Sequence, residues 1–306
     1  MELGYYPGCA LKAHATGYEY GMAIEATLGA LGFTLKEVPD WNCCGASAGH
    51  MTNSTLTRAL NVRNLALAEA AGLKEILAPC PLCTKELGLA QHEVKEHPEL
   101  LAAAQEAAEM VYRCSVRPIT LVELLHRNLD LLKERAAAGK LADLKVACYY
   151  GCLHTRPPDV MTYDDTEQPT AMDEVCRTLG LAPVEWPNKT ECCGAGFTMS
   201  RPTVVARLTG RLLKAARLAG AEAFVVACPM CQANLDMRQS EAAADAGLAE
   251  DLHMPVLYLA QVVGLALGLE PKALGLSTHF VDTADFVARL RGEPPAAAEP
   301  AQGAVA

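Results

Sequence analysis

The chain has 306 residues, of which 51% are hydrophobic and 20% charged, and its net charge is −10. This length allows two domains of ordinary size with a substantial core. The negative charge excludes nucleic acid as an expected partner, because phosphate binding needs a basic surface. The N-terminus lacks the basic and apolar stretches of a signal peptide, and the longest apolar segment, 256–269, is too short to span a membrane. We therefore expect a cytoplasmic protein with no direct membrane span, whose thirteen cysteines stay as thiols or bind metal.

The apolar pattern predicts short strands that alternate with helices. In the first half, a helix with Tyr20 and Ile24 on one face ends at Gly32, and in the second half a helix with Met172 on its apolar face ends at Gly180. The segment 256–269 is predicted to be a buried strand and helix. The other strands are expected at residues 2–6, 35–38, 75–78, 144–150, 183–186 and 223–227, and two longer helices at 54–71 and 202–219.

This alternation predicts an α/β fold with parallel sheets and crossover helices. The two halves also match each other in sequence around their cysteines and glycines, so we expect two tandem pseudo-symmetric modules, each with a small parallel sheet flanked by helices. The predicted parts are a first cysteine-rich domain at 1–130, a solvated helical linker at 131–144, a second cysteine-rich domain at 145–270, and an extension at 271–306 that is disordered from about residue 293.

Ten of the cysteines form one five-cysteine pattern that occurs twice. In each copy a single cysteine is followed by a Cys-Cys-Gly string and then by a C-x-x-C motif with an internal proline. Each of these elements follows a predicted strand, so all five sulfurs should meet at the carboxyl edge of a sheet. The first cysteine set is Cys9, Cys43, Cys44, Cys80 and Cys83, and the second cysteine set is Cys152, Cys192, Cys193, Cys228 and Cys231.

Five thiolates are one more than a tetrahedral zinc ion or a cubane iron–sulfur cluster needs. Adjacent cysteines point apart in an extended chain, but at a turn loosened by glycine they can reach two different metal atoms. The pattern therefore favours a polynuclear metal–sulfur cluster in each module. A zinc ion in one of the two modules remains an alternative, as does a non-redox zinc scaffold.

The single cysteine, the Cys-Cys-Gly string and the C-x-x-C motif each occur twice. With this doubled pattern, the chain resembles the cysteine-rich CCG domain proteins and, among them, the family of heterodisulfide reductase catalytic (B) subunits. The resemblance covers the chain to about residue 270; one departure is the 34-residue gap between Cys193 and Cys228, which is one residue below the usual range. It implies two noncubane [4Fe-4S] clusters, one held by the first cysteine set and one by the second.

The resemblance also implies a function. A small disulfide would bind between the two clusters, take one electron from each and be cleaved to two thiols, with electrons supplied by the ferredoxin-like and the flavin-bearing subunits of a heterodisulfide reductase-like complex. The alternative is an electron-transfer subunit of a respiratory complex, similar to the E-type subunit of succinate dehydrogenases, without disulfide chemistry. The identity of the disulfide and the direction of electron flow stay open.

Polar residues beside the cysteines are candidates for proton or substrate handling. His154 is the favoured catalytic residue, because it lies two residues after Cys152 and a histidine can donate a proton near neutral pH. The loop 155–169 is longer than its counterpart in the first module and is expected either to cover the mouth of the site, to contact a partner or to be a plain surface insertion. The other candidates are Lys12, His14, His50, Arg156 and Arg201.

Three cysteines fall outside the repeated pattern. Cys148 lies in a predicted strand and Cys176 on the apolar face of a predicted helix, so both are expected in the core. Cys114 lies between the modules and is given no role.

Overall fold

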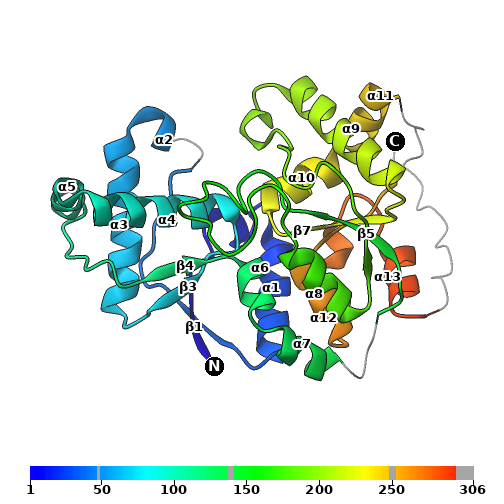
Figure 1. Ribbon diagram of the computed structural model, residues 1–306, viewed down its shortest axis with the longest axis horizontal. Helices are drawn as coiled ribbons and strands as arrows, with labels where there is room; N and C mark the ends of the chain where they lie inside the picture. The colour runs from blue at the N-terminus through cyan, green and yellow to red at the C-terminus, as the bar shows by residue number, and fades with distance from the viewer. Residues whose placement is uncertain (47–48, 137–140, 248–252, 294–306) are drawn as a thin grey trace.

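The computed structural model describes residues 1–46, 49–136, 141–247 and 253–293. It contains two four-stranded parallel sheets, one in each half of the chain, with strand orders β2-β1-β3-β4 and β6-β5-β7-β8. Helices flank both sheets (Figure 1), so the predicted α/β class with two tandem modules is confirmed. The strands are β1 Glu2–Tyr5, β2 Thr34–Glu37, β3 Glu75–Leu77, β4 Arg117–Ile119, β5 Lys145–Tyr149, β6 Ala182–Pro183, β7 Ala223–Val226 and β8 Val256–Tyr258.

The helices follow the predicted alternation. α1 and α8 end where glycine was expected to stop them, and Gly32 and Gly180 have φ values of 85° and 102°. The helices are α1 Tyr18–Ala30, α2 Gly49–Thr52, α3 Ser54–Ala70, α4 Pro81–Glu96, α5 Pro98–Ala108, α6 Leu121–His126, α7 Leu129–Ala136, α8 Ala171–Leu179, α9 Pro202–Leu218, α10 Pro229–Met237, α11 Gln239–Ala246, α12 Leu259–Ala266 and α13 Ala284–Leu290, with 3-10 turns η1 Cys9–Leu11, η2 Ala195–Phe197 and η3 Leu276–Thr278.

The strand predicted at 183–186 is wrong in its bounds, since β6 covers only two residues. Pro183 has no N–H to donate to the sheet. Beyond it the chain turns so that Trp186 is buried and its indole N–H donates to the carbonyl of Cys148 at 3.1 Å. The buried strand and helix predicted at 256–269 are present as β8 and α12.

Residues 131–136 of the predicted linker lie in α7, which is not fully solvated, and residues 141–144 are not helical. In α7, Lys133 and Arg135 are exposed, whereas Leu132 is buried because this helix packs against α8. Residues 137–140 of the linker and the segment predicted to be disordered, from residue 294 onward, lie outside the described residues.

The two modules share a core through α1. This helix belongs to the first module in sequence but packs against α12 of the second (Figure 1). Tyr20 stacks on Tyr258 with 4.2 Å between ring centroids, and its hydroxyl donates to the carbonyl of Ala227. The Thr27 hydroxyl donates to the carbonyl of Ala260 at 2.9 Å. These contacts cross the sequence boundary between the modules and therefore pack the two modules against each other.

Candidate functional site

The first cysteine set comes together at the carboxyl edge of the first sheet. Cys9 begins η1 after β1, Cys43 and Cys44 follow β2, and Cys80 caps the N-terminus of α4 after β3. The sulfurs of Cys43 and Cys9 are 3.9 Å apart, and those of Cys44 and Cys83 are 3.3 Å apart. Residues up to 74 positions apart therefore meet at one point, as the strand order predicted.

The second cysteine set has the same arrangement in the second module. Cys152 follows β5, and Cys228 caps the N-terminus of α10 after β7. The sulfurs of Cys193 and Cys231 are 3.5 Å apart, and the Cys152 thiol hydrogen-bonds to Cys192. This matches the first module, where the second cysteine of the pair also meets the last cysteine of C-x-x-C.

One glycine in each module lets the backbone approach the sulfurs. Gly8 and Gly151 both have φ of 66°, and a Cβ atom added at either would lie 3.0 Å from a sulfur, that of Cys83 or that of Cys231. A side chain would be strained by the backbone conformation and would also crowd the thiol. These positions thus leave room around the sulfurs that any other residue would fill.

The backbone after each cysteine pair is turned toward the first sulfur of the pair. The N–H of Gly45 donates to Sγ of Cys43 at 3.5 Å, and the N–H of Gly194 donates to Sγ of Cys192 at 3.3 Å. Hydrogen bonds of this kind stabilise thiolates and tune metal–sulfur sites.

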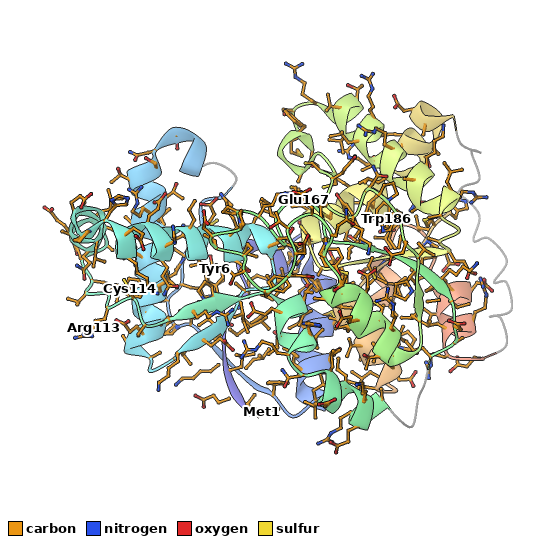
Figure 2. The ribbon with its side chains drawn as sticks, in the orientation of Figure 1. Met1, Tyr6, Arg113, Cys114, Glu167 and Trp186 are labelled. Carbon is orange, nitrogen blue, oxygen red and sulfur yellow. The ribbon has the colours of Figure 1, made fainter. Side chains whose placement is uncertain are left out.

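A buried tyrosine braces each cysteine pair, and sequence reasoning missed this role. The hydroxyl of Tyr6 donates to the carbonyl of Asn42 at 2.8 Å, and the hydroxyl of Tyr149 donates to the carbonyl of Glu191 at 2.7 Å. Each acceptor is the residue just before a Cys-Cys pair. Figure 2 labels Tyr6 in the first module. The available signal was a tyrosine three residues before the first cysteine in both repeats.

Two asparagines hold the same turns from different helices. Asn61 of α3 donates to the carbonyl of Cys44 at 2.8 Å, and Asn234 of α10 donates to the carbonyl of Cys193 at 3.3 Å. Both side chains are buried, and Oδ1 of Asn61 has no hydrogen-bond partner among the described residues. The repeat does not reveal this pair, because the two asparagines are not at equivalent positions.

The two cysteine sets meet between the modules. The side chains of Cys80 and Cys228 interact with each other, and both residues are buried. Beside them lies a cavity of about 280 Å³. The first module lines it with Ala46, Pro81, Leu82, Lys85 and Glu86, and the second with Tyr150, Leu153, Ala195, Gly196 and all five of its cysteines. The cavity is therefore formed jointly by both modules.

Several of these thiols are shifted toward the thiolate form, which is the metal-binding form. Hydrogen bonds from Cys44 and Cys9 lower the pKa of Cys43 to about 2. A hydrogen bond from Cys152 lowers the pKa of Cys192 to about 6. Thiols packed this closely share protons, so that part of each set carries negative charge near neutral pH.

The donor atoms fit a metal–sulfur cluster. Each set consists of sulfur alone, and soft thiolate ligands select iron–sulfur clusters, zinc or copper over hard oxygen-binding cations. Within the described ranges, no three histidine, cysteine or carboxylate side chains are grouped to hold one metal ion. Five sulfurs, a glycine that leaves space and an N–H directed at a sulfur suit a group larger than a single ion.

His154 lies behind the site rather than on the cavity. It is fully buried, its Nε2 is 3.3 Å from the carbonyl of Ala227, and its Nδ1 is 3.3 Å from the hydroxyl of Tyr163. Burial lowers the pKa of His154 to about 4, so the imidazole is neutral at pH 7. Ala227 directly precedes Cys228, which keeps His154 near the site, and its catalytic role stays a prediction.

The other polar candidates are scattered around the site. Lys12 forms an ion pair with Glu37 at 2.6 Å, and Arg156 forms one with Glu167 at 2.8 Å. His14 and Arg201 are exposed, and the side chain of His50 lies outside the described part of the structure. None of the described candidates lines the cavity between the modules.

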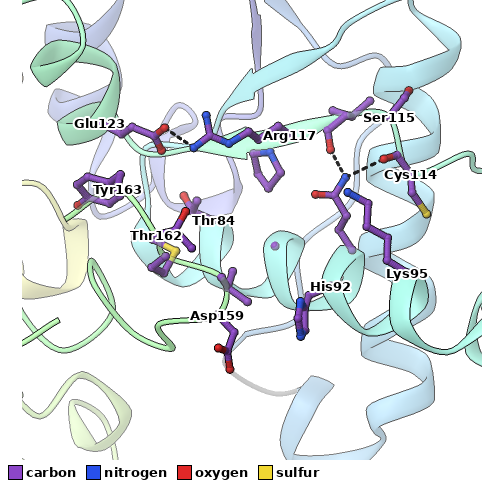
Figure 3. A pocket seen from close by; sticks show the side chains of 16 residues that line it. Thr84, His92, Lys95, Cys114, Ser115, Arg117, Glu123, Asp159, Thr162 and Tyr163 are labelled. Atoms are coloured by element: carbon purple, nitrogen blue, oxygen red, sulfur yellow. Dashed lines mark hydrogen bonds and ion pairs between the residues drawn. The ribbon is translucent and has the colours of Figure 1, made fainter. Parts of the chain in front are cut away.

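The loop 155–169 packs on the first module and does not line the cavity. Val160 lies so close to Gly88 of α4 that a Cβ atom there would be 2.4 Å from its side chain. Figure 3 shows the second cavity that results, of about 290 Å³, with Asp159 of the loop opposite His92 and Lys95 of α4. The expectation that this loop covers the mouth of the site is therefore not supported.

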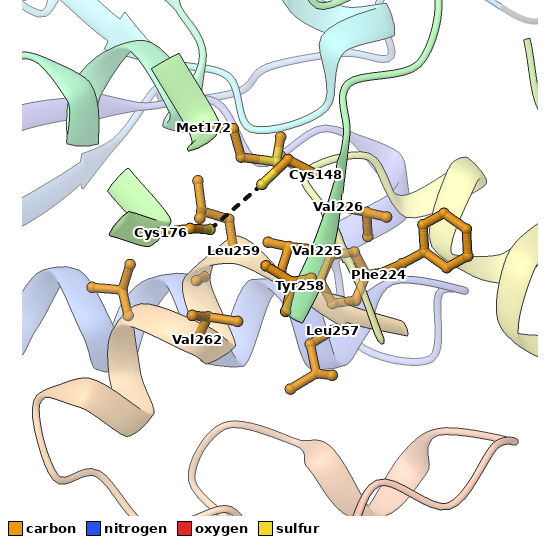
Figure 4. Close-up of a cluster of buried hydrophobic side chains, with 14 of the residues drawn as sticks. Cys148, Met172, Cys176, Phe224, Val225, Val226, Leu257, Tyr258, Leu259 and Val262 are labelled. Atoms are coloured by element: carbon orange, nitrogen blue, oxygen red, sulfur yellow. Dashed lines mark hydrogen bonds between the residues drawn. The ribbon is translucent and has the colours of Figure 1, made fainter. Parts of the chain in front are cut away.

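Cys148 and Cys176 are core residues, as predicted. Both are fully buried, and their sulfurs lie 3.7 Å apart among apolar side chains (Figure 4). Cys114 is partly exposed at the end of the second cavity, and its carbonyl accepts a hydrogen bond from Gln91 at 3.3 Å.

Taken together, two parallel sheets that each present five cysteines at one edge define a tandem cysteine-rich protein. The chain belongs to the cysteine-rich domain family known as CCG, whose sequence profile matches residues 3–88 and 146–236. This confirms the resemblance inferred from the doubled pattern.

Two relatives match nearly the whole length of this chain. The 8-methylmenaquinol:fumarate reductase membrane anchor subunit of Wolinella succinogenes is 32% identical, over 92% of this chain and 97% of the relative. The B subunit of the ferredoxin/F(420)H(2)-dependent CoB-CoM heterodisulfide reductase of Methanosarcina acetivorans is 29% identical, over 94% and 97%. These comparisons support a redox role in general. No helix in the described residues is both long and apolar enough to cross a membrane.

A solved structure shares the fold. A hypothetical protein from Helicobacter pylori superposes with a TM-score of 0.70 and 14% identity over 92% of this chain. This chain spans about half the length of that protein, 52%, and the likeness concerns the fold alone.

Proposed function

We propose that the chain is the catalytic subunit of a heterodisulfide reductase-like complex, which cleaves or forms a substrate disulfide. One observation carries the proposal: the two cysteine sets meet through Cys80 and Cys228, beside a cavity that both modules line. A substrate in this cavity would contact the second cysteine set directly and would reach the first set at Pro81, the residue after Cys80. The relatives named as B subunits of heterodisulfide reductases agree with this function.

The reaction has a simple balance. A disulfide accepts two electrons and two protons, its S–S bond breaks, and two thiols are released. When bound, iron–sulfur clusters would supply the electrons singly, so a paired site suits a two-electron reaction. Cys9, Cys43, Cys44, Cys80 and Cys83 would hold one noncubane [4Fe-4S] cluster, and Cys152, Cys192, Cys193, Cys228 and Cys231 would hold the other.

The remaining cavity residues would bind the substrate. Pro81, Leu82 and Leu153 give an apolar wall that excludes water around the disulfide. Lys85 and Glu86, an ion pair of 2.6 Å, are the charged groups that the first module contributes to the same wall. His154 would not contact the substrate. Its hydrogen bond to the Ala227 carbonyl would instead position the backbone that leads into Cys228.

Electrons would come from a partner, which we propose to be a ferredoxin-like subunit that is itself supplied by a flavin-bearing subunit of the same complex. Relatives named as subunits of reductase complexes support an assembly of several chains.

The test is metal analysis followed by an assay of thiol release. The chain, purified without oxygen, should contain about eight irons and matching sulfide, as expected for two four-iron clusters. Reduced methyl viologen should then drive thiol release from the coenzyme M–coenzyme B heterodisulfide or from lipoamide. Zinc without sulfide would refute the proposal, and about four irons with one zinc would favour the mixed-metal alternative.

A second function is favoured by the 32% identity to a fumarate reductase subunit. In that case the chain would pass electrons in a respiratory complex without acting on a disulfide. A chain with full iron content that is reduced by a menaquinol analogue or reoxidised by a menaquinone analogue, but is reoxidised by none of the disulfides, would establish this function instead.

A further inference from the structure

The outer helix of the second module, α9, is basic on its exposed face. Its residues include no carboxylate, although the chain as a whole carries a net charge of −10. Arg207, Arg211, Lys214 and Arg217 supply its exposed or partly exposed positive charge. α9 lies along the outer edge of the module and packs on α11 (Figure 1), and nitrogen-tipped side chains project from this edge in Figure 2.

Most of these cations have no acidic partner in the part of the chain that the structure describes. Arg211 contacts Glu191 at 3.3 Å, whereas Arg207, Lys214 and Arg217 form no ion pair with any described residue. The face therefore has positive charge that the described part of the chain does not neutralise.

The equivalent helix of the first module shows that the fold does not require such a face. In α3, Arg58 is paired with Glu93 at 2.8 Å, and Arg63 is paired with Asp40. The two helices occupy matching places after their Cys-Cys-Gly turns, yet only the second keeps most of its cations unpaired among the described residues. This asymmetry indicates that the unpaired cations of α9 bind a partner molecule.

Exposed apolar side chains follow the second cysteine pair in the sequence and lead into the basic face. Phe197, Met199 and Val204 lie between Cys192 and the body of α9 in the sequence, and their exposed fractions are 49%, 93% and 36%. Cys192 is exposed as well. An apolar patch bordered by charge is typical of a protein-binding surface.

We propose that this docking surface, Phe197, Met199 and Val204 together with the α9 cations, binds an acidic electron-carrier protein of the ferredoxin kind. The inference rests on the proposed function and assigns the entry of electrons to the side of the second cysteine set. Opposite charges would steer and orient the carrier, and the apolar side chains would exclude water where the two proteins touch. A lipid surface here would cover the exposed edge of the cysteine set, whereas an electron carrier needs access to it.

The electron balance is complete within this scheme. Each carrier molecule is oxidised by one electron, so two encounters supply the two electrons that one disulfide consumes, and the two protons come from water.

The experiment measures binding directly. The probe is an acidic bacterial ferredoxin with two [4Fe-4S] clusters, titrated calorimetrically into the intact, iron-loaded chain at low and at physiological ionic strength. The variant R207E/K214E reverses two cations on one helix face, seven residues apart. The control K74E/K272E makes the same change in net charge at two exposed lysines that are unpaired among the described residues and lie outside the docking surface.

We expect R207E/K214E to weaken ferredoxin binding about tenfold or more at low ionic strength, and K74E/K272E to change it less than about twofold. A carbodiimide should also cross-link Lys214 to ferredoxin carboxylates. Unchanged binding by R207E/K214E, equal weakening by the control, or no binding by the parent would overturn the inference. Binding of the parent to phosphatidylglycerol vesicles, lost in R207E/K214E and without ferredoxin binding, would overturn it in favour of a membrane surface.

A separate assay keeps the two proposals distinguishable. If the parent chain releases no thiol with reduced methyl viologen, the disulfide function fails, while the binding data still decide whether the docking surface exists.

Discussion

The side chains of Cys80 and Cys228 interact with each other, although 148 positions separate them in the sequence. Each caps the N-terminus of a helix that follows the third strand of its module. Hydrogen bonds from Cys228 and Cys83 hold the pKa of Cys80 well below its usual range. The two cysteine sets are therefore in direct contact, not merely in the same fold.

Replacing Cys80 should consequently affect the clusters of both cysteine sets. We expect Cys80→Ser to lower the iron content from about eight to about four per chain and to alter the electron paramagnetic resonance signal of the remaining cluster. Cys43→Ser is the matched control, because Cys43 is exposed and the sulfurs it contacts belong to the first set. Cys43→Ser should lose the same amount of iron but leave the paramagnetic resonance signal of the second cluster unchanged. If this signal is identical in the two variants, the contact between Cys80 and Cys228 does not couple the two sites.

The glycines beside the sulfurs should be essential for cluster binding. Gly8→Ala combines a positive φ with a Cβ 3.0 Å from the Cys83 sulfur, so we expect about half of the iron to be lost. Gly72→Ala is the control, since Gly72 has φ of 77° but nothing within 4 Å of an added Cβ. It should lose about 1 kcal/mol of stability and keep its iron. Equal iron loss in both would mean that backbone strain alone is responsible.

The tyrosine behind each cysteine pair should tune its own site only. Tyr149→Phe removes the hydrogen bond to the Glu191 carbonyl, at a cost of about 1 kcal/mol. We expect a shifted reduction potential for the second cluster and an unchanged one for the first, measured by redox titration. Tyr112→Phe, which removes a buried hydroxyl that accepts from Gln91 away from both sets, should shift neither potential.

His154 should make stability depend on pH. Its folded pKa, about 4, is below the ordinary value of 6.5, so the unfolded chain binds the proton more readily. Stability is then fully present above pH 6.5 and falls as the pH drops toward 4. Urea unfolding should show that the free energy of unfolding of the parent falls between about pH 6.5 and 5. We expect His154→Asn to make this fall smaller by roughly 2 kcal/mol.

The exposed His14 provides the control for this experiment, because asparagine tolerates its left-handed backbone conformation. His14→Asn should retain the parent's pH dependence. If His154→Asn retains it too, burial does not suppress the charge on His154.

Filling the cavity between the modules should block the substrate without removing iron. Leu82→Trp adds bulk to the cavity wall, and we expect thiol release with reduced methyl viologen to fall about tenfold or more at full iron content. Leu218→Trp, at a position 80% exposed on α9, adds the same ring outside the cavity and should leave the rate unchanged. A normal rate in Leu82→Trp would place the substrate elsewhere.

The apolar alternation and the doubled cysteine pattern together were sufficient to predict the α/β class, the two modules and the meeting of each cysteine set at a sheet edge. Those features follow from local order, because a cysteine just after a parallel strand must lie at the carboxyl edge whatever the rest of the chain does. The apolar periodicity likewise identified Cys148 and Cys176 as core residues.

Only the tertiary structure decided how the two modules face each other. The contact between Cys80 and Cys228, the cavity beside it and the burial of His154 depend on α1 crossing to the second module and on Tyr20 stacking against Tyr258. These are packing contacts between residues far apart in the chain, and neither periodicity nor spacing in the sequence encodes which surfaces of two folded modules will pair.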